Sequence, residues 1–256
     1  MRLDSLKLRA RNAARRVGLE IKPSNLHSRF DLRLVELLNA KQATVLLDVG
    51  ANRGQFATEI LKSGYGGTVV SFEALPHVYQ ELSASAAAFG KRWVVAPRAA
   101  LSDSEGHVNF NVTKNFASSS LLQPTSYMLG KGEPLTILET IEVPTRRLDN
   151  LVSTLGLVDE SFFLKMDVQG AEHLVLAGAP EIIKRSVGVL LEVHLVDYYE
   201  GQPTWKQLDD IMTSNGLRLW DVHPFLRGVH GRLEGMDIVY VRPDDASVNA
   251  GPSALG

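Results

Sequence analysis

The 256-residue sequence contains no cysteine. Structural disulfides, thiolate catalysis and cysteine-ligated zinc are therefore excluded. An excess of charge of one sign is also missing, because 27 Lys and Arg residues face 29 Asp and Glu residues, which gives a net charge of −2. Without a basic excess, no global field favours nucleic acid as a partner.

Long apolar runs are missing as well. No stretch approaches the roughly 20 apolar residues needed to cross a bilayer, so we expect no transmembrane segment. The first residues lack the apolar core of a signal peptide, because Arg9, Arg11, Arg15 and Arg16 interrupt it. We therefore expect a cytoplasmic protein.

The most informative segment that is present covers residues 45–54, Val-Leu-Leu-Asp-Val-Gly-Ala-Asn-Arg-Gly. An apolar run ends in Asp48, Gly50 and Gly54 follow, and a helical pattern comes next. This order predicts a buried strand, a tight turn and a helix that begins at a ligand. We expect the turn to present free backbone N–H groups to a nucleotide-like cofactor, and Asp48 to meet a cationic or hydroxyl-bearing part of it.

The glycine spacing bears on which cofactor binds. A dinucleotide loop that begins at Gly50 would have glycine at positions 52 and 55. This chain has Asn52 and Gln55 there, which counts against an NAD-dependent oxidoreductase. An ordinary strand-to-helix turn without a ligand is a further alternative.

Strands and helices alternate along most of the chain. This alternation predicts an α/β fold with a mostly parallel sheet and helices on both faces. The expected strands are residues 45–49, 68–72, 93–95, 162–166 and 188–191, followed by an antiparallel pair, 217–222 and 236–241. The expected helices are residues 29–40, 55–61, 76–89 and 205–215.

Acidic residues follow four of these strands: Asp48, Glu73, Asp167 and Glu192. Ligands of open parallel sheets bind beyond the carboxyl ends of the strands, so we expect these acids to converge on one crevice. Glu73 comes about 20 residues after the glycine loop, where a carboxylate accepts hydrogen bonds from both ribose hydroxyls. A helix cap or an ion pair is the alternative for any single acid.

His194 follows Glu192 by two residues, so the alternation of a strand points both side chains to one side. Together with Asp167, they suit either a hard divalent ion or a general base supported by acids. Glu172 belongs to this group or is a first-turn acid that stabilises its helix. A surface histidine without a catalytic role is the alternative for His194. We also expect Ala100, Leu101 and Ser102 to lie beside an adenine.

These motifs together resemble the FkbM family of S-adenosylmethionine-dependent O-methyltransferases. The resemblance implies a Rossmann-like class I methyltransferase fold: a mostly parallel seven-stranded sheet with an antiparallel last strand. Two positions depart from the family pattern, because Ala74 replaces a usual proline and Gln169 a usual glutamate. The matching segments are residues 47–54, 71–76, 100–106, 118–121, 148–149 and 164–172.

The resemblance also implies a division of the site into a cofactor side and a reaction side. Its cofactor is S-adenosylmethionine, Mg²⁺ held by Asp167 and Glu192 is a candidate second cofactor, and His194 is our first choice for the base. On the cofactor side we place Asp48, Gly50, Asn52, Gly54, Glu73, Ala74, Ala100, Leu101, Ser102 and Asp167. On the reaction side we place Asp167, Glu172, Glu192 and His194.

Known members of the family methylate hydroxyls of sugars, glycolipids and macrolides. The chain looks like a bacterial, mycobacterial-like member that modifies sugars. We therefore expect a sugar, oligosaccharide or glycolipid as the acceptor, with a macrolide or other polyketide hydroxyl as the alternative.

We divide the chain into three parts. Residues 1–44 form an N-terminal helical extension whose first helix, residues 2–18, is basic and amphipathic. Residues 45–243 form the methyltransferase domain, with an insertion at about residues 104–150 that we expect on the acceptor side. Residues 244–256 are an expected disordered tail. The basic helix and the insertion could build a homodimer interface or a lid.

Overall fold

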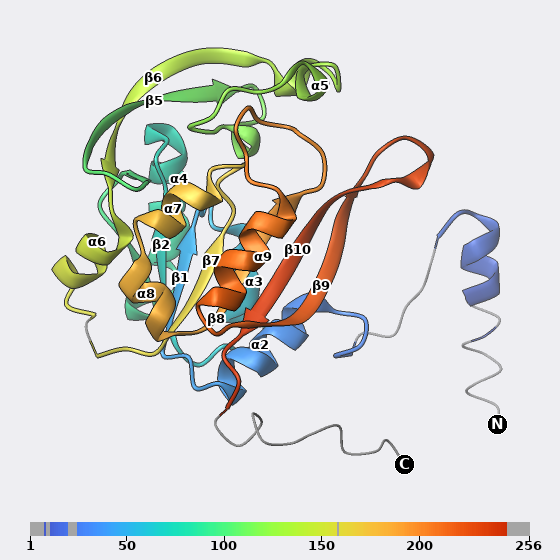
Figure 1. Ribbon diagram of the computed structural model, residues 1–256. Helices are drawn as coiled ribbons and strands as arrows, with labels where there is room; N and C mark the ends of the chain where they lie inside the picture. The colour runs from blue at the N-terminus through green and yellow to red at the C-terminus, as the bar shows by residue number, and fades with distance from the viewer. Residues whose placement is uncertain (1–7, 9–10, 20–24, 158, 245–256) are drawn as a thin grey trace.

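A seven-stranded sheet runs through the centre of the computed structural model, which describes residues 8, 11–19, 25–157 and 159–244 (Figure 1). The strand order is β3-β2-β1-β7-β8-β10-β9. Neighbours are parallel except at β10, which runs antiparallel to both β8 and β9. The predicted α/β fold is therefore confirmed. The strands are β1 (Val45–Val49), β2 (Thr68–Phe72), β3 (Trp93–Val95), β7 (Phe162–Met166), β8 (Ser186–His194), β9 (Arg218–Arg227) and β10 (Leu233–Val241).

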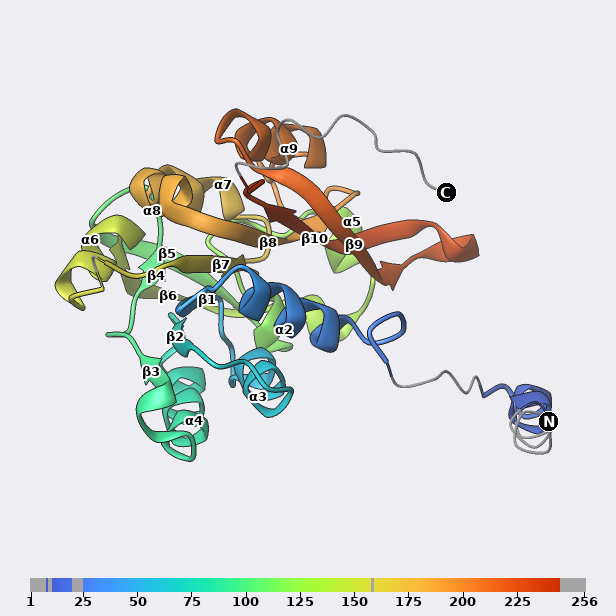
Figure 2. The same ribbon diagram turned by 90° about the horizontal axis from the view of Figure 1, so that it is seen from below.

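Helices cover both faces of this sheet, as Figure 2 shows from below. One face carries α2 (Phe30–Ala40), α3 (Gln55–Lys62) and α4 (Pro76–Ala87). The other carries α6 (Leu148–Thr154), α7 (Glu172–Ala177), α8 (Pro180–Arg185) and α9 (Trp205–Ser214). The central strands therefore bury both of their sides, which explains why their sequences are continuous apolar runs.

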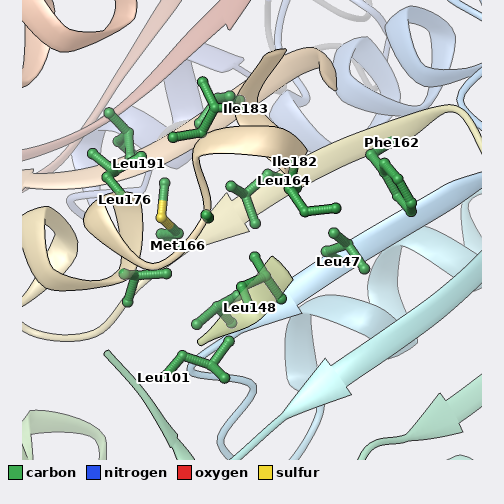
Figure 3. Packing of buried hydrophobic residues seen from close by; sticks show 14 of the residues in the cluster. Leu47, Leu101, Leu148, Phe162, Leu164, Met166, Leu176, Ile182, Ile183 and Leu191 are labelled. Atoms are coloured by element: carbon green, nitrogen blue, oxygen red, sulfur yellow. The ribbon is translucent and has the colours of Figure 1, made fainter. Parts of the chain in front are cut away.

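The larger of the two cores lies between the sheet and α6, α7, α8 and α9. Leu47, Leu164 and Leu191 come from adjacent strands and meet Ile182 and Ile183 of α8 in this layer (Figure 3). Burying a side chain of this size stabilises the fold by roughly 1.5–3 kcal/mol. The packing holds the strand ends, and with them the turns that follow, in fixed relative positions.

Two strands of the insertion and one short strand just before it form a small second sheet of order β4-β6-β5. Its members are β4 (Ala100–Leu101), β5 (Gly106–Thr113) and β6 (Ile137–Arg146). Between β5 and β6 lie a 3₁₀ turn, η2 (Phe116–Ser118), and a short helix, α5 (Ser126–Leu129). Figure 1 shows this unit above the carboxyl ends of β1, β2 and β7.

The fifth parallel strand is longer than predicted. We expected residues 188–191 with the strand ending at Glu192, but β8 continues to His194 because β10 pairs with it from Gly188 to His194. Asp237 and Gly235 stand opposite Glu192 and His194, respectively. Both predicted site residues therefore lie within the sheet and not beyond its edge.

Part of the N-terminal extension is described. Residues 8 and 11–16 are helical, and Val17 is 73% exposed. The rest of the predicted first helix, and all but Asp244 of the predicted tail, lie outside the described residues. Among the helices of the described ranges, none has the length and apolar character to span a bilayer.

Candidate active site

The turn after β1 is in close contact with the turn after β7. Gly50 has a φ of +71°, in the left-handed region, and a Cβ there would lie 1.9 Å from the carbonyl oxygen of Asp167. The N–H of Asp167 donates to the carbonyl oxygen of Val49 at 3.1 Å. Only glycine allows this approach, because any side chain would collide with the β7 turn.

The N–H groups of the β1 turn face inward. Each N–H from residue 50 to residue 54 donates to an acceptor inside the protein. The first two share the carbonyl oxygen of Phe72 at 3.2 and 3.0 Å, and the third, from Asn52, donates to Glu73 Oε2 at 2.9 Å. For these five residues the prediction of free N–H groups facing a ligand is therefore wrong.

Glu73 is held entirely by main-chain donors. Its Oε1 accepts the N–H groups of Ala74 and Leu75, each at 2.9 Å, and its Oε2 accepts that of Asn52. Burial raises the pKa of Glu73, while these three hydrogen bonds act in the opposite direction. A carboxylate has about four acceptor sites, so with three occupied Oε2 can still receive a hydroxyl donor from a ligand.

Glu73 forms one wall of a pocket at the carboxyl ends of the central strands. The open space in it, including the mouth, is about 640 Å³. Apolar side chains predominate near Glu73, and polar groups lie toward β7. The lining residues are Val49, Gly50, Asn52, Phe72, Glu73, Ala74, Leu75, Ala99, Ala100, Leu101, Phe110, Phe116, Ala117, Ser119, Leu121, Asp167, Val168 and Gln169.

Three predicted cofactor residues lie outside this lining. Asp48 is fully buried inside β1, where it accepts a hydrogen bond from Ser71 and pairs with Lys165 Nζ at 2.9 Å. A Cβ on Gly54 would lie 2.4 Å from the Trp93 ring, so this glycine is needed for packing against β3.

The third, Ser102, is buried and donates to Asp103 at 3.1 Å. The structure thus gives Asp48, Gly54 and Ser102 structural contacts. The other predicted cofactor residues all line the pocket.

The opposite end of the pocket is acidic. Asp167, after β7, lines the pocket with a side chain that is 33% exposed. The Gln169 amide nitrogen donates to Asp167 Oδ1 at 2.8 Å and to Glu192 Oε1 at 2.7 Å. One amide group therefore bridges the two carboxylates. Of the two, Glu192 is the more buried, with 15% of its side chain exposed.

Further charges surround this pair. Burial raises the pKa of Glu192 well above its usual range, and the charges of Asp167 and Asp237 raise it further. Burial likewise raises the pKa of Asp237 to about 6. Burial alone would lower the pKa of Lys165, but the carboxylates of Asp48 and Asp167 outweigh it, so its pKa is raised. Lys165 is therefore a permanent cation beside the acidic group.

His194 lies behind Glu192 and does not line the pocket. Its Nε2 is 3.7 Å from Glu192 Oε1, and its ring packs against those of Tyr198 and Tyr199. Burial lowers the pKa of His194 to about 4, so the imidazole is neutral and weakly basic. A general base must lie within hydrogen-bond reach of the proton it takes, or be linked to it by a water molecule. The geometry therefore gives no support to His194 as the base.

Glu172 shapes the turn after β7. Its Oε1 accepts the N–H groups of Val168 and Gly170 at 3.2 and 3.3 Å. The side chain is buried, burial raises its pKa to about 7, and it does not line the pocket. Of the two predicted roles for Glu172, these contacts support the one that stabilises the start of its helix.

The donor set does not fit the predicted Mg²⁺ site. Mg²⁺ prefers oxygen ligands in an octahedral arrangement. Here an amide nitrogen lies between Asp167 and Glu192, where an ion would have to bind. Within the described ranges, no group of three or more His, Asp or Glu residues is arranged to hold a metal ion. We therefore derive no catalytic step through a metal.

The insertion forms one wall of the pocket and is tied to the domain at several places, two of which involve the following side chains. Near the pocket, Ser120 Oγ donates to the carbonyl oxygen of Gln169 at 2.8 Å. Farther away, the buried Glu234 of β10 accepts hydrogen bonds from Tyr127, Tyr198 and Lys131. The lining residues that come from the insertion are Phe110, Phe116, Ala117, Ser119 and Leu121.

Three residues of this arrangement have no role in the sequence prediction: Lys165, Gln169 and Tyr199. Lys165 was detectable, because a cation inside the apolar run Phe-Phe-Leu-Lys-Met must find a buried partner. Gln169 stood out only as a departure from the family pattern. Tyr199 gives no signal, since its hydroxyl reaches Gln169 Oε1, at 2.8 Å, only through the tertiary fold.

The chain matches one family model and two known proteins. Residues 48–219 match the family model described as the Methyltransferase FkbM domain. The chain is 28% identical over 236 residues to 2-O-methyltransferase NoeI of Sinorhizobium fredii, covering 90% of this chain and 92% of that protein. It is 28% identical over 205 residues to AMB antimetabolite synthetase AmbE of Pseudomonas aeruginosa, covering 68% of this chain and 10% of that protein.

Solved structures of methyltransferases also match. One is magnesium protoporphyrin IX methyltransferase (ChlM) from Synechocystis PCC 6803, with a TM-score of 0.45 at 12% identity. The match covers 90% of this chain and 89% of that one.

Proposed function

This chain belongs to the FkbM methyltransferase domain family, and on that premise we propose that it is an S-adenosylmethionine-dependent O-methyltransferase. Its acceptor is a hydroxyl of a sugar, oligosaccharide or glycolipid. The observation that carries the proposal is Glu73, a buried carboxylate fixed by three N–H donors at the wall of the pocket.

The pocket suits a nucleoside that carries no phosphate. Glu73 Oε2, which accepts a single N–H group, is placed to accept a ribose hydroxyl, and Ala100 and Leu101 provide an apolar surface for adenine. The N–H groups of residues 50–54 already donate to acceptors of the protein, and Asn52 and Gln55 stand where a dinucleotide loop has glycine. This difference favours S-adenosylmethionine over a nicotinamide dinucleotide.

When bound, S-adenosylmethionine supplies a methyl group already activated by its sulfonium. The chain must then orient an acceptor hydroxyl and remove its proton. Orientation can lower the activation barrier by up to ~7–11 kcal/mol, and a positioned base can raise the rate roughly 10²–10⁴-fold. Asp167 is the acid of the reaction side that lines the pocket, so proton removal belongs at that end.

The acceptor class rests on two points. NoeI, to which the chain is similar along nearly its full length, is a 2-O-methyltransferase. Polar groups also gather at the reaction end of the lining, where Ser119, Asp167 and Gln169 can hydrogen-bond a polyhydroxylated molecule.

Calorimetric titration tests the cofactor. We expect the protein to bind S-adenosylhomocysteine and to show no heat of binding with NADH. Glu73→Gln should weaken S-adenosylhomocysteine about 10–100-fold, because hydrogen bonds to a charged group contribute about 1.5–3 kcal/mol. The matched control is Glu81→Gln on α4, an acid that is 51% exposed and outside the pocket lining. Equal affinities for the two variants would contradict the proposal.

A panel of acceptors tests the reaction. Methyl α-L-rhamnoside, methyl α-L-fucoside and methyl α-D-glucoside represent sugars, and erythromycin represents macrolides. Formation of S-adenosylhomocysteine should require one of the glycosides. Turnover with erythromycin alone would support the methyltransferase activity but would contradict a sugar as the acceptor.

A further inference from the structure

Gln169 links the two carboxyl groups of the reaction end to Tyr199 and to the insertion. Its side-chain nitrogen bridges Asp167 and Glu192, and its side-chain oxygen accepts a hydrogen bond from Tyr199. Its main-chain oxygen accepts one from Ser120 of the insertion. Its φ of +56° lies in the left-handed region, which non-glycine residues adopt at a cost of about 1–3 kcal/mol. The surrounding contacts therefore hold Gln169 in a defined and unfavourable conformation.

The orientation of the amide follows from its neighbours. The Tyr199 hydroxyl lies 2.8 Å from Gln169 Oε1 and 2.9 Å from the carbonyl oxygen of Ser118. The other end of the amide lies against oxygens of two carboxyl groups, Asp167 and Glu192, which act as acceptors, so that end is the NH₂ group. Tyr199 has a single proton, which is shared between Gln169 Oε1 and the Ser118 carbonyl oxygen. The amide oxygen thus faces the donor, and both N–H bonds face the carboxylates.

We propose that Gln169 is a positioning residue that holds the carboxylate of Asp167 in place as the proton acceptor for the substrate hydroxyl. This inference rests on the proposed methyltransferase function. Gln169 fixes Oδ1 of Asp167, whose side chain lines the pocket, and Oδ2 lies 3.9 Å from Lys165 Nζ.

The exposure of the side chains supports this choice. Asp167 is 33% exposed, whereas Glu192 is 15% and His194 is 7% exposed. Burial and the neighbouring negative charges raise the pKa of Glu192 well above its usual range, which favours the protonated form of that carboxyl group. Lys165 Nζ is a cation 3.9 Å from Asp167 Oδ2.

The step balances as a proton transfer coupled to substitution. The hydroxyl proton passes to Asp167 Oδ2 while the acceptor oxygen forms its bond to the methyl carbon. The carbon–sulfur bond breaks, and its electron pair stays on sulfur. The proton leaves Asp167 for solvent through the open mouth of the pocket.

Two substitutions of Gln169 test the bridge. Gln169→Glu keeps the shape and removes both N–H donors, and Gln169→Met keeps the length and removes all polarity. We expect either to lower kcat about 10–100-fold, because misplacement of a reacting group by about 1 Å costs up to 10²-fold. The KM for S-adenosylmethionine and the affinity for S-adenosylhomocysteine should stay within about threefold, since neither variant touches Glu73.

Tyr199→Phe provides a second test that leaves Gln169 in place. It removes the donor that orients the amide, so kcat should fall severalfold alone and should not fall further in the Gln169→Met background. Equal and additive losses in both backgrounds would show that Tyr199 acts independently of the bridge and would overturn the proposal.

A spectroscopic measurement needs no turnover. In ¹⁵N-labelled protein, the side-chain amide protons of Gln169, identified by their loss in Gln169→Glu, should exchange slowly with solvent. They should shift in Asp167→Asn and in Tyr199→Phe.

Two failures can be told apart. If wild-type protein does not bind S-adenosylhomocysteine, the proposed function fails. If it binds, but Gln169→Glu and Gln169→Met keep kcat within twofold of wild type, only the positioning role is overturned. Rapid exchange of the Gln169 amide protons would overturn that role as well.

Discussion

The two ends of the pocket hold their carboxylates in different ways. Glu73 is fixed by three main-chain N–H groups, two from the residues that follow it and one from the turn after β1. Asp167 and Glu192 are fixed by one side chain, Gln169, which is itself held by Tyr199. The first end is thus built by backbone geometry and the second by side-chain contacts among distant segments.

Because of this difference, the two ends should tolerate different substitutions. Main-chain donors persist when side chains are replaced, so the Glu73 end depends mainly on the turn conformation. At the Asp167 end a single substitution changes the donors of two carboxylates. The cofactor end should therefore resist changes in side chains, and the reaction end should respond to conservative ones.

The sharpest test of this contrast is at the reaction end itself. Asp167→Asn should lower kcat roughly 10²–10⁴-fold, the range of a general base, with S-adenosylhomocysteine affinity nearly unchanged. His194→Gln should lower kcat less than about tenfold, because His194 does not line the pocket. Steady-state kinetics measures kcat for both variants. A greater loss of kcat in His194→Gln than in Asp167→Asn would reverse the assignment of the base.

The cofactor end should fail through its backbone. Gly50→Ala adds a Cβ at 1.9 Å from the Asp167 carbonyl oxygen, at a φ of +71°. Strain and clash together should destabilise the fold by roughly 2–5 kcal/mol. Gly156→Ala is the matched control, because Gly156 has a φ of +73° and open space around its Cβ position. Equal midpoints of chemical unfolding for the two variants would show that the close approach does not matter.

The turn after β7 makes a pH-dependent contribution to the free energy of unfolding through Glu172. Burial raises the pKa of Glu172 from 4.5 to about 7, so the folded chain holds this proton more tightly than the unfolded chain. Its contribution is full below pH 4.5 and is lost as the pH rises through about 7. The loss is up to roughly 3 kcal/mol, from 1.36 kcal/mol per pKa unit.

Glu172→Gln keeps an oxygen for both N–H donors and removes the titration. Its free energy of unfolding should therefore fall less than that of wild type between pH 4.5 and pH 8. Urea unfolding at several pH values measures the difference, and parallel curves for the two proteins would contradict the assignment.

The smallest effect concerns the remote attachment of the insertion. Lys131→Met removes the ion pair with Glu234, whose side chain is 2% exposed, and should lower Tm by a few degrees. Lys206→Met removes the pair with Asp210, whose side chains are 70% and 61% exposed, and should change Tm less. Thermal unfolding compares them, and a larger decrease for Lys206→Met would mean that the Glu234 contact does not stabilise the insertion.

Sequence reasoning was most successful where local rules suffice. Apolar runs located β1, β2, β3 and β7, and the spacing from the glycine turn located Glu73. It was wrong about the end of β8, because pairing with β10 extends that strand beyond its apolar run. It also placed Asp48 at a ligand, whereas the strand buries it against Lys165.

The sequence by itself determined the alternation of strands and helices, the glycines of the β1 turn and the acid that follows β2. Each depends on neighbours within a few residues, through periodicity and backbone conformation. Only the tertiary structure decided which acid faces the pocket, because Asp167, Gln169, Glu192 and Tyr199 meet from separate segments. Their distances depend on the packing of β7 against β8 and on the insertion above them, which no local pattern encodes.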